Sequence, residues 1–420
     1  MIISNKAIRK VGKQIRSEFP NVSEELINTL EDYRTSFKGA ITKTYYRLNR
    51  NAQKVLRSSV VTYRLKRIES IINKLDRFND MSLDRMWDIA GCRCILNNKK
   101  QVYQLFSILQ SDFQIRKIND YIQSPQSDGY RSLHVYVECI DSKKIVEIQL
   151  RTEDHHAWAT LVEITDLIYN ERIKEKKGKT DLQKLLLLFS KTDSMTDKEK
   201  MIVIDIVRKY KYIENLTGIF ARNYFSIRKQ WLSVERKGET FFLIEASKDK
   251  IPEIVGFKNF NSAEDEYFKR FTIEQDVNRV LTHLPRPSFK KISQAYSNYF
   301  LTYHTFLDDC FSFIEELIIS TLKRRRFRLF IVYLDYFSFL YANYIRTMKN
   351  EIDEFLKSNN GRKDSRSKEW VQDIGNRLDK RNRSNSKLNR MIEANRPRSW
   401  IIRHILGSQY NRIKKQHGLE

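Results

Sequence analysis

The sequence predicts an α/β (α+β) protein, in which a mixed sheet with flanking helices is followed by a small α+β module and a helical, basic C-terminal region. Between residues 61 and 170 helical and strand-like patterns alternate, which is typical of a sheet covered by helices. The 420 residues contain only 12 Gly and 6 Pro, which favours long helices. The formal net charge is +25, and residues 361–420 contribute 16 Lys or Arg against 6 Asp or Glu.

A chain of this length is expected to form several domains. We expect an N-terminal helical segment over 1–60, a sheet domain over 61–185, a helical and small α+β module over 186–310 and a helical, strongly basic region over 311–420. Regulation is one interpretation of the 186–310 module.

The individual elements follow from hydrophobic periodicity. Strands are expected at Cys92–Leu96, Ser132–Cys139, Lys144–Leu150, Thr240–Ala246, Glu253–Phe257 and Asn278–Leu284. Helices are expected at Tyr63–Arg77, Lys100–Ser111, Thr152–Tyr169, Lys184–Lys229, Ala263–Phe271, Ser288–Tyr296 and Thr302–Lys357, with a charged connector over 171–180.

Composition narrows the class of protein. The four cysteines have no zinc spacing, so buried free thiols in a reducing cytoplasm are expected. The N-terminus lacks the apolar core of a signal peptide. The apolar run Leu329–Ile345 contains Asp335 and Asn343, which favours a buried helix over a membrane anchor. A cytoplasmic protein without a membrane partner is expected, and the positive charge favours nucleotides or RNA as partners.

Polar residues line one face of the predicted strand Lys144–Leu150 and continue just beyond it. Side chains alternate along a strand, so Glu147, Gln149 and Arg151 share one face. A solvated sheet face would explain the pattern equally well.

Asp88 lies where the chain enters another strand, and carboxylates on neighbouring strands can share one Mg²⁺. Asp88 as a turn or helix cap is the alternative.

Cations also gather on the predicted helix Tyr63–Arg77. Leu65, Ile68, Ile72 and Leu75 recur at helical spacing and form its buried stripe. Arg64 and Lys66 open the helix. Ser70, Lys74 and Arg77 follow another face, and a hydroxyl among cations suits a triphosphate. Such a face is more often simply solvated.

The stretch SDGYRSLHV, residues 127–135, could be only a turn that enters a strand. Gly129 permits close backbone approach, Tyr130 can stack on a base, and Arg131 and His134 can meet phosphates.

The region over about Tyr63–Tyr169 closely resembles the synthetase domain of the RelA/SpoT family. The motifs that carry the resemblance are, in this order and spacing, RxK, SxxxK, DIAGxR, DYI…P…GYRSLH and EIQLRT. The resemblance implies a nucleotidyltransferase fold. It also implies transfer of the β,γ-pyrophosphate of ATP to the ribose 3′-hydroxyl of GDP or GTP, which yields the alarmones ppGpp and pppGpp of the stringent response.

The resemblance also implies roles for individual residues. Asp88 and Glu147 would hold Mg²⁺, and Glu147 with Gln149 would position or deprotonate the attacking hydroxyl. The ATP-binding residues would be Arg64 and Arg93 around the adenine and Lys66, Ser70, Lys74 and Arg77 at the phosphates. The acceptor-binding residues would be Tyr130, Arg131, His134 and Arg151.

Departures from the family pattern leave the acceptor open. Many small synthetases have Lys-Pro-Asn where this chain has Gln126, Ser127 and Asp128. No histidine precedes His134, so the family's hydrolase activity is not expected. The alternative acceptor is the 3′ end of tRNA, as in toxin relatives that block translation. Some of those toxins are restrained by their own C-terminal half and act in phage defence. An RNA-binding protein with an inactive synthetase core is a further alternative.

Beyond the core, HHAWATLVE (155–163) and AYSNYF (295–300) resemble a longer subgroup of the family with a C-terminal module. His155 and His156 are expected to shape a helix rather than a metal site. The basic C-terminal region indicates RNA or ribosome contact, with solvated charge as the alternative. Trp370, Trp400 and Tyr410 are stacking candidates that helix packing would explain equally well. A homo-oligomer is compatible with the resemblance.

Overall fold

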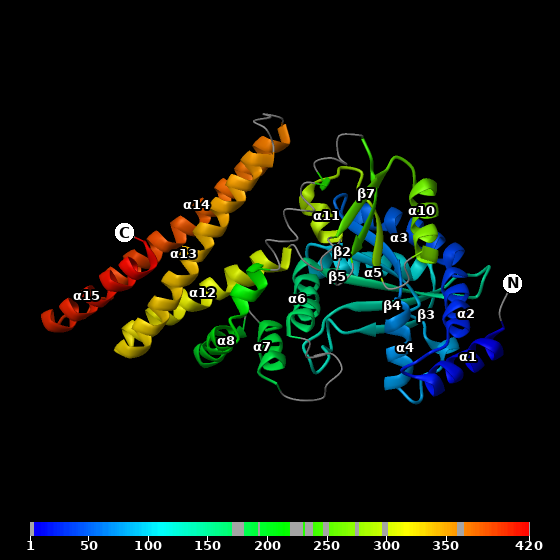
Figure 1. The fold of residues 1–420 in the computed structure, drawn as a ribbon, viewed down its shortest axis with the longest axis horizontal. Coiled ribbons are helices and arrows are strands. Elements are labelled where there is room, and N and C mark those ends of the chain that lie inside the picture. The colour runs from blue at the N-terminus through cyan, green and yellow to red at the C-terminus, as the bar shows by residue number, and fades with distance from the viewer. Residues whose placement is uncertain are drawn as a thin grey trace. The chain divides into compact units, whose positions relative to one another are not determined.

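The computed structural model describes residues 4–169, 180–191, 194–218, 230–231, 238–246, 252–273, 277–295, 301–358 and 365–419 (Figure 1). The chain forms two compact units. The first comprises Met1–Ser190 and Leu216–Tyr303, and the second comprises Lys191–Asn215 and His304–Glu420. The connector predicted at 171–180 lies outside the described residues except for Thr180, and residues 296–300 of the AYSNYF stretch lie outside them entirely.

An eight-stranded mixed sheet forms the centre of the first unit, in the order β3-β4-β5-β2-β1-β8-β6-β7. β2 and β5 pair in parallel, and the other pairs in the described part of the sheet are antiparallel. The strands are β1 Val60–Leu65, β2 Ala90–Leu96, β3 Gln114–Asp120, β4 Leu133–Glu138, β5 Ile145–Thr152, β6 Phe241–Ala246, β7 Glu253–Phe257 and β8 Asn278–His283.

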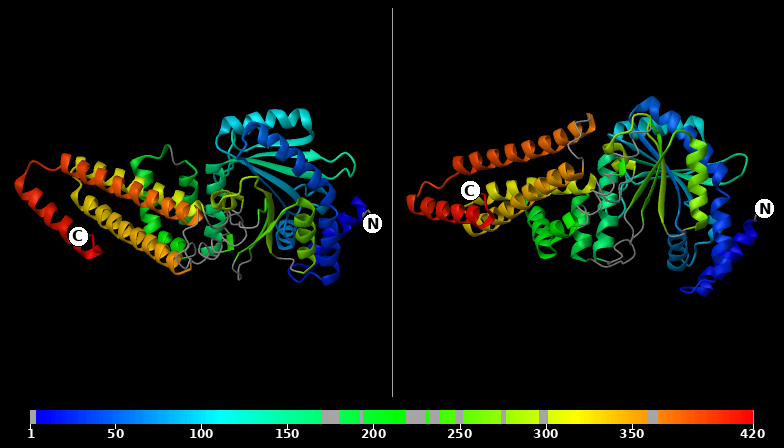
Figure 2. Two further views of the ribbon diagram at one scale, coloured as in Figure 1. Left: turned by 90° about the horizontal axis from the view of Figure 1, so that it is seen from above. Right: turned by 45° about the horizontal axis from the view of Figure 1, so that its top comes forward.

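Helices cover both faces of this sheet (Figure 2). The helices of the first unit are α1 Asn5–Glu18, α2 Glu24–Thr35, α3 Lys38–Val55, α4 Ile68–Arg77, η1 Leu83–Arg85, α5 Lys99–Asp112, α6 Glu153–Tyr169, α7 Asp181–Phe189, α10 Phe260–Ile273 and α11 Phe289–Ala295. α3, α5 and α10 share one hydrophobic core with the apolar face of the sheet. α6 packs on β5 and β2, α7 packs on α6, and α11 packs on β1.

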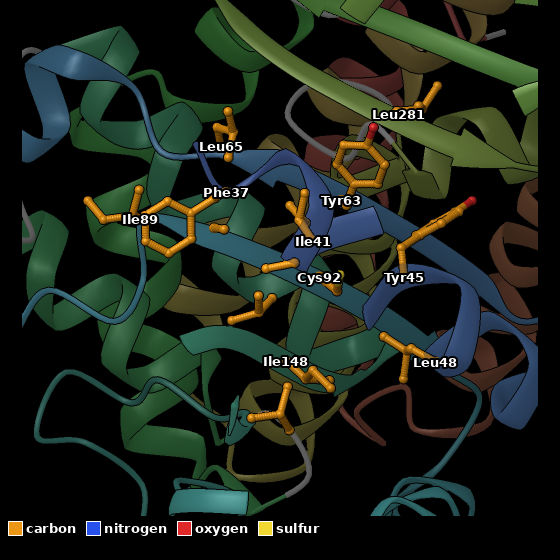
Figure 3. Close-up of a cluster of buried hydrophobic side chains, with 14 of the residues drawn as sticks. Phe37, Ile41, Tyr45, Leu48, Tyr63, Leu65, Ile89, Cys92, Ile148 and Leu281 are labelled. Carbon is orange, nitrogen blue, oxygen red and sulfur yellow. The ribbon is translucent and has the colours of Figure 1, made fainter. Parts of the chain in front are cut away.

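The core forms where the helical spacing of apolar residues on α3 meets the alternation of buried residues on the facing strands. On α3, Ile41, Tyr45 and Leu48 are buried at helical spacing. On the facing strands every second residue is buried, including Cys92 on β2 and Ile148 on β5 (Figure 3). The other face of these strands is therefore free to carry polar side chains.

The segment predicted as one helix over Tyr63–Arg77 divides into a strand and a helix. β1 ends at Leu65 and α4 begins at Ile68, with Arg67 as its extended N-cap. The prediction was wrong because the β-branched and aromatic run VVTY favours a strand. Leu65 therefore belongs to β1, and Ile72 on α4 is only half-buried.

β3 was not predicted, because its sequence QIRKIND is largely exposed at the sheet edge and lacks apolar alternation. The six strands that were predicted are all present, and each of their ends lies within two residues of the predicted position. The strands predicted for the C-terminal module are present, but β8 pairs with β1 in the register Thr62↔Thr282, Tyr63↔Leu281. These strands therefore extend the central sheet and do not form a sheet of their own. The regulatory role suggested for residues 186–310 stays a prediction.

The helix predicted over 184–229 is interrupted. α7 ends at Phe189, α8 begins at Asp197, and the chain is helical again over 212–218. Thr180 and Thr196 each form a capping box, so each starts a helix of its own. Residues 219–229 of that prediction lie outside the described residues.

The second unit is helical. It contains α8 Asp197–Lys209, α12 Leu301–Lys323 from His304 onward, α13 Phe327–Ser358, α14 Ser365–Ala394 and α15 Trp400–His417. The apolar run of α13 is a buried helix, as predicted, and no helix within the described ranges is long and apolar enough to cross a membrane. Trp370 is fully buried, and the Tyr410 hydroxyl is 2.5 Å from Asn389 Oδ1, so both pack within the unit. Trp400 is 74% exposed.

Candidate functional site

The polar face of the sheet is built by strand register. β2 and β5 place Gly91 opposite Glu147 and Arg93 opposite Gln149. β4 and β5 place His134 opposite Gln149. Directly paired residues point to the same side of a sheet, so these side chains share one surface. The alternate residues of the same strands are buried in the core.

Two lysines hold the carboxylate of Asp88, just before β2. Lys66, directly after β1, places its Nζ 2.7 Å from Asp88 Oδ2. Lys74, on α4, places its Nζ 2.9 Å from both carboxylate oxygens. Burial raises the pKa of Asp88, but the charges and hydrogen bonds of the two lysines outweigh burial and hold the pKa well below its usual range. Asp88 is therefore ionised, and two cations lie at one point of the site.

Glu147 is a buried carboxylate that three donors surround. His134 Nδ1 lies 2.8 Å and the Tyr136 hydroxyl 3.0 Å from Oε1, while Gln149 Nε2 lies 2.8 Å from Oε2. Burial raises the pKa of Glu147, but His134 and Gln149 lower it further than burial raises it. The negative charge of Asp88 opposes this lowering, so the two carboxylates act on each other electrostatically.

Tyr130 lies beside this pair and joins it to Arg151. Its hydroxyl accepts a hydrogen bond from Arg151 Nη2 at 2.6 Å and lies 2.8 Å from His134 Nε2. Arg151 also donates to Gln149 Oε1 at 3.1 Å. Burial raises the pKa of Tyr130, but Arg151 and His134 lower it to about 8. The polar side chains of β4 and β5 thus form one connected network.

The loop before β4 depends on a glycine. Gly129 has a φ of +94°, and a Cβ there would lie 2.4 Å from Ser190 Oγ. The backbone N–H of Tyr130 donates to Asp128 Oδ1 at 2.9 Å. Arg131 donates to the carbonyl oxygen of Ser190 at 2.6 Å. The structure therefore places Arg131 against the end of α7, apart from the His134–Glu147 network.

The remaining residues predicted for the donor site lie on β1, β2 and α4. Arg64 and Arg93 are on the same face of β1 and β2. Burial lowers the pKa of Arg93 to about 9, helped by the like charges of Arg151 and Arg64, and within the described residues its Nε has no hydrogen-bond partner. Ser70 is half-buried on α4. Arg77 is exposed, with its guanidinium over the Phe78 ring.

Some contacts in the site were missed from sequence. Tyr136 touches Glu147, and its position two residues after His134 on a strand could have indicated the shared face. Tyr121 and Trp158 lie 5.9 and 6.4 Å from Tyr130, ring centre to ring centre. His156 is buried in α6. In the described part of the chain no three His, Cys, Asp or Glu side chains cluster as a metal site would require.

The site thus combines two carboxylates that act on each other electrostatically with two lysines that pair with one of them. Residues 63–174 match the family described as "Region found in RelA / SpoT proteins". This part of the chain thus carries the RelA/SpoT region, and the resemblance stated from the motifs is confirmed.

Curated relatives match the same part of the chain. The GTP pyrophosphokinase YwaC of Bacillus subtilis is 37% identical over 113 residues, which are 23% of this chain and 53% of that protein. The GTP pyrophosphokinase YjbM of Bacillus subtilis is 32% identical over 126 residues, 28% of this chain and 60% of that protein. A guanosine-3′,5′-bis(diphosphate) 3′-pyrophosphohydrolase of Borreliella burgdorferi is 27% identical over 160 residues, 38% of this chain and 24% of that protein.

The chain thus spans between 24% and 60% of the length of these relatives. Among solved structures, the small alarmone synthetase 2 from Bacillus subtilis is 27% identical, covering 39% of this chain and 91% of that one, with a TM-score of 0.33.

Proposed function

We propose that the chain is an ATP-dependent pyrophosphokinase that transfers the β,γ-pyrophosphate of ATP to a ribose 3′-hydroxyl of GDP or GTP. The observation that supports this most directly is the pair of interacting carboxylates, Asp88 just before β2 and Glu147 on β5. One carboxylate is held by two lysines and the other by His134, Tyr136 and Gln149. Both lie within the synthetase domain, whose relatives include two GTP pyrophosphokinases.

On the donor side, Lys66 and Lys74 would exchange part of their contact with Asp88 for phosphate oxygens of ATP. Ser70 and Arg77 would extend this phosphate site along α4. Arg64 and Arg93 would flank the adenine, because an arginine plane stacks well on an aromatic base. The unpaired Nε of Arg93 supports a role in ligand binding.

Asp88 and Glu147 fit Mg²⁺ by the chemistry of their oxygens. Mg²⁺ is usually bound by one or two carboxylates together with substrate phosphates and water. Two protein carboxylates with no further ligand cluster among the described residues match that mode of binding. Bound there, Mg²⁺ would neutralise developing charge on the phosphates.

On the acceptor side, Tyr130 would stack on the base while His134 and Arg151 would meet the phosphates. Glu147 is ionised and accepts hydrogen bonds, so it can take the proton of the attacking 3′-hydroxyl, with Gln149 orienting that hydroxyl. The hydroxyl oxygen attacks the β-phosphorus in line and AMP leaves. The protein contributes mainly position and charge. Arg131 is held by Ser190 and would order the loop.

The 3′ end of tRNA is the second candidate acceptor, and Asp128 favours it. Its carboxylate caps the Tyr130 amide at the place where many guanine-using relatives carry an amide side chain. The net charge of +25 suits an RNA substrate. Self-inhibition by the C-terminal half and a role in phage defence would accompany this second candidate.

Incubating the purified chain with ATP labelled in the β- and γ-phosphates, and with GDP, GTP or bulk tRNA, tests the proposal. Label in a guanosine nucleotide supports the first acceptor, and label on tRNA supports the second. Asp88→Ala serves as the inactive control because it removes one of the two proposed Mg²⁺ ligands. Transfer to no acceptor, where a known GTP pyrophosphokinase is active, would refute the proposed function.

A further inference from the structure

The end of β1 is held from both sides, and one of the two holding groups comes from outside the synthetase domain. On the β2 side, the backbone N–H of Lys66 donates to the carbonyl oxygen of Ile89 at 2.8 Å. On the other side, β8 pairs with β1 only as far as Tyr63. The next amide on that edge belongs to Leu65, and it donates to the Tyr267 hydroxyl at 2.9 Å. The Tyr267 side chain therefore takes over where the β8 ladder ends.

Tyr267 lies on α10, and its position is fixed by packing. It is fully buried, and its ring centre lies 5.2 Å from that of Tyr63 and 4.9 Å from that of Phe271, both edge-on. Rings in such a dense cluster keep one orientation. The hydroxyl is thus presented to the Leu65 amide by a rigid support.

The amide that Tyr267 holds lies between two residues of the proposed donor site. Leu65 separates Arg64, proposed to flank the adenine, from Lys66, which pairs with Asp88. A shift of the Leu65 backbone would move both cations at once.

We propose that Tyr267 is a positioning residue for the donor nucleotide, acting through the Leu65 amide on Arg64 and Lys66. This inference rests on the proposed function, because it assigns ATP to the Arg64 and Lys66 side of the site. It assigns part of the donor site's geometry to α10, which begins 86 residues after the end of the matched family region at residue 174.

The test compares Tyr267→Phe with Tyr63→Phe. Each variant removes one buried tyrosine hydroxyl from the same aromatic cluster. The Tyr63 hydroxyl, however, contacts Glu264 at 3.3 Å and, among the described residues, no backbone group of the donor site, and Glu264 keeps its contact with Thr42. Tyr63→Phe therefore reports the effect of losing a buried hydroxyl from this cluster that does not hold the Leu65 amide.

Binding of a non-hydrolysable ATP analogue and the KM values of the transfer reaction are measured for both variants. Leaving the Leu65 amide unpaired is expected to weaken analogue binding and raise the KM for ATP about 5- to 30-fold in Tyr267→Phe, which corresponds to about 1–2 kcal/mol. The KM for the acceptor is expected to change less than about twofold, and both KM values in Tyr63→Phe are expected to stay near wild type.

Wild-type analogue binding by Tyr267→Phe, or equal weakening in Tyr63→Phe, would overturn the inference. These outcomes leave the proposed function untouched if wild type transfers pyrophosphate. If wild type binds the analogue but transfers to no acceptor, the proposed function fails, and selective weakening in Tyr267→Phe still supports the positioning role. A wild-type chain that binds no analogue refutes both.

Discussion

Replacing Glu147 by glutamine separates the charge of this side chain from its shape. The carboxylate accepts from His134 and Tyr136 on Oε1 and from Gln149 on Oε2. If the side-chain oxygen of the new glutamine takes the place of Oε1, its NH₂ group takes the place of Oε2. That NH₂ group then faces the NH₂ group of Gln149, and two donors meet. Rotating the side-chain amide of Gln149 by about 180° would relieve this clash. It would then turn the Gln149 NH₂ group toward Arg151, which donates to Gln149 Oε1 in the native structure. In the orientation that keeps an acceptor toward His134 and Tyr136, at least one donor, on Gln149 or Arg151, is therefore left without an acceptor.

The structure sets the expected magnitudes. A buried donor without an acceptor costs about 1–3 kcal/mol, so the free energy of unfolding of Glu147→Gln should fall by that amount. Transfer should fall by about 10²- to 10⁴-fold, because the amide cannot accept the proton of the attacking hydroxyl. The loss of activity should exceed what the loss of stability explains.

Transfer is measured under single-turnover conditions at saturating ATP and acceptor, and stability by urea unfolding. Glu138→Gln is the matched control. Glu138 is another buried carboxylate, at the end of β4, and it accepts from Arg116 Nε at 2.6 Å outside the predicted site. It should lose stability and keep transfer. A folded Glu147→Gln variant with transfer within about tenfold of wild type would refute the role of Glu147.

Further predictions concern the acceptor side. Gly129→Ala should lower the free energy of unfolding by about 1–2 kcal/mol, because an alanine is strained at this positive φ. It should also raise the KM for the acceptor, because the new Cβ would displace Ser190. An unchanged acceptor KM would argue against this loop as the acceptor site. Tyr130→Ala should raise the acceptor KM about tenfold or more while binding of the ATP analogue persists, since stacking on a base contributes about 1–3 kcal/mol. Burial lowers the pKa of His134, but Glu147 and Tyr130 raise it by more, so the folded pKa lies above the unfolded value of about 6.5. The pairing of protonated His134 with Glu147 therefore stabilises the fold fully below about pH 6.5, and this stabilisation is lost as the pH rises through the folded pKa. The difference in unfolding free energy between wild type and His134→Asn should therefore be larger at pH 6 than at pH 9, and a difference independent of pH would contradict the pairing.

The sequence predicted the polar face of β5 well, because alternation along one strand needs no long-range information. It failed at Tyr63 and Leu65, whose spacing fits both a strand and the stripe of the following helix. Strand pairing then decided between the two periods. The contact between Arg131 and Ser190 joins residues that are 59 positions apart, so no local pattern could show it. Tyr136 was missed because its role depends on the β4–β5 register.

The shared sheet also determines how truncated chains would behave. β1 is an interior strand only because β8 covers its outer edge. A chain cut after residue 190 would keep the whole matched family region but leave the mostly apolar strand Val60–Leu65 with an open edge. Open edges of this kind pair with other chains and aggregate. Loss of activity in such a fragment would therefore reflect an exposed strand edge, and it would be poor evidence that the removed half activates the enzyme.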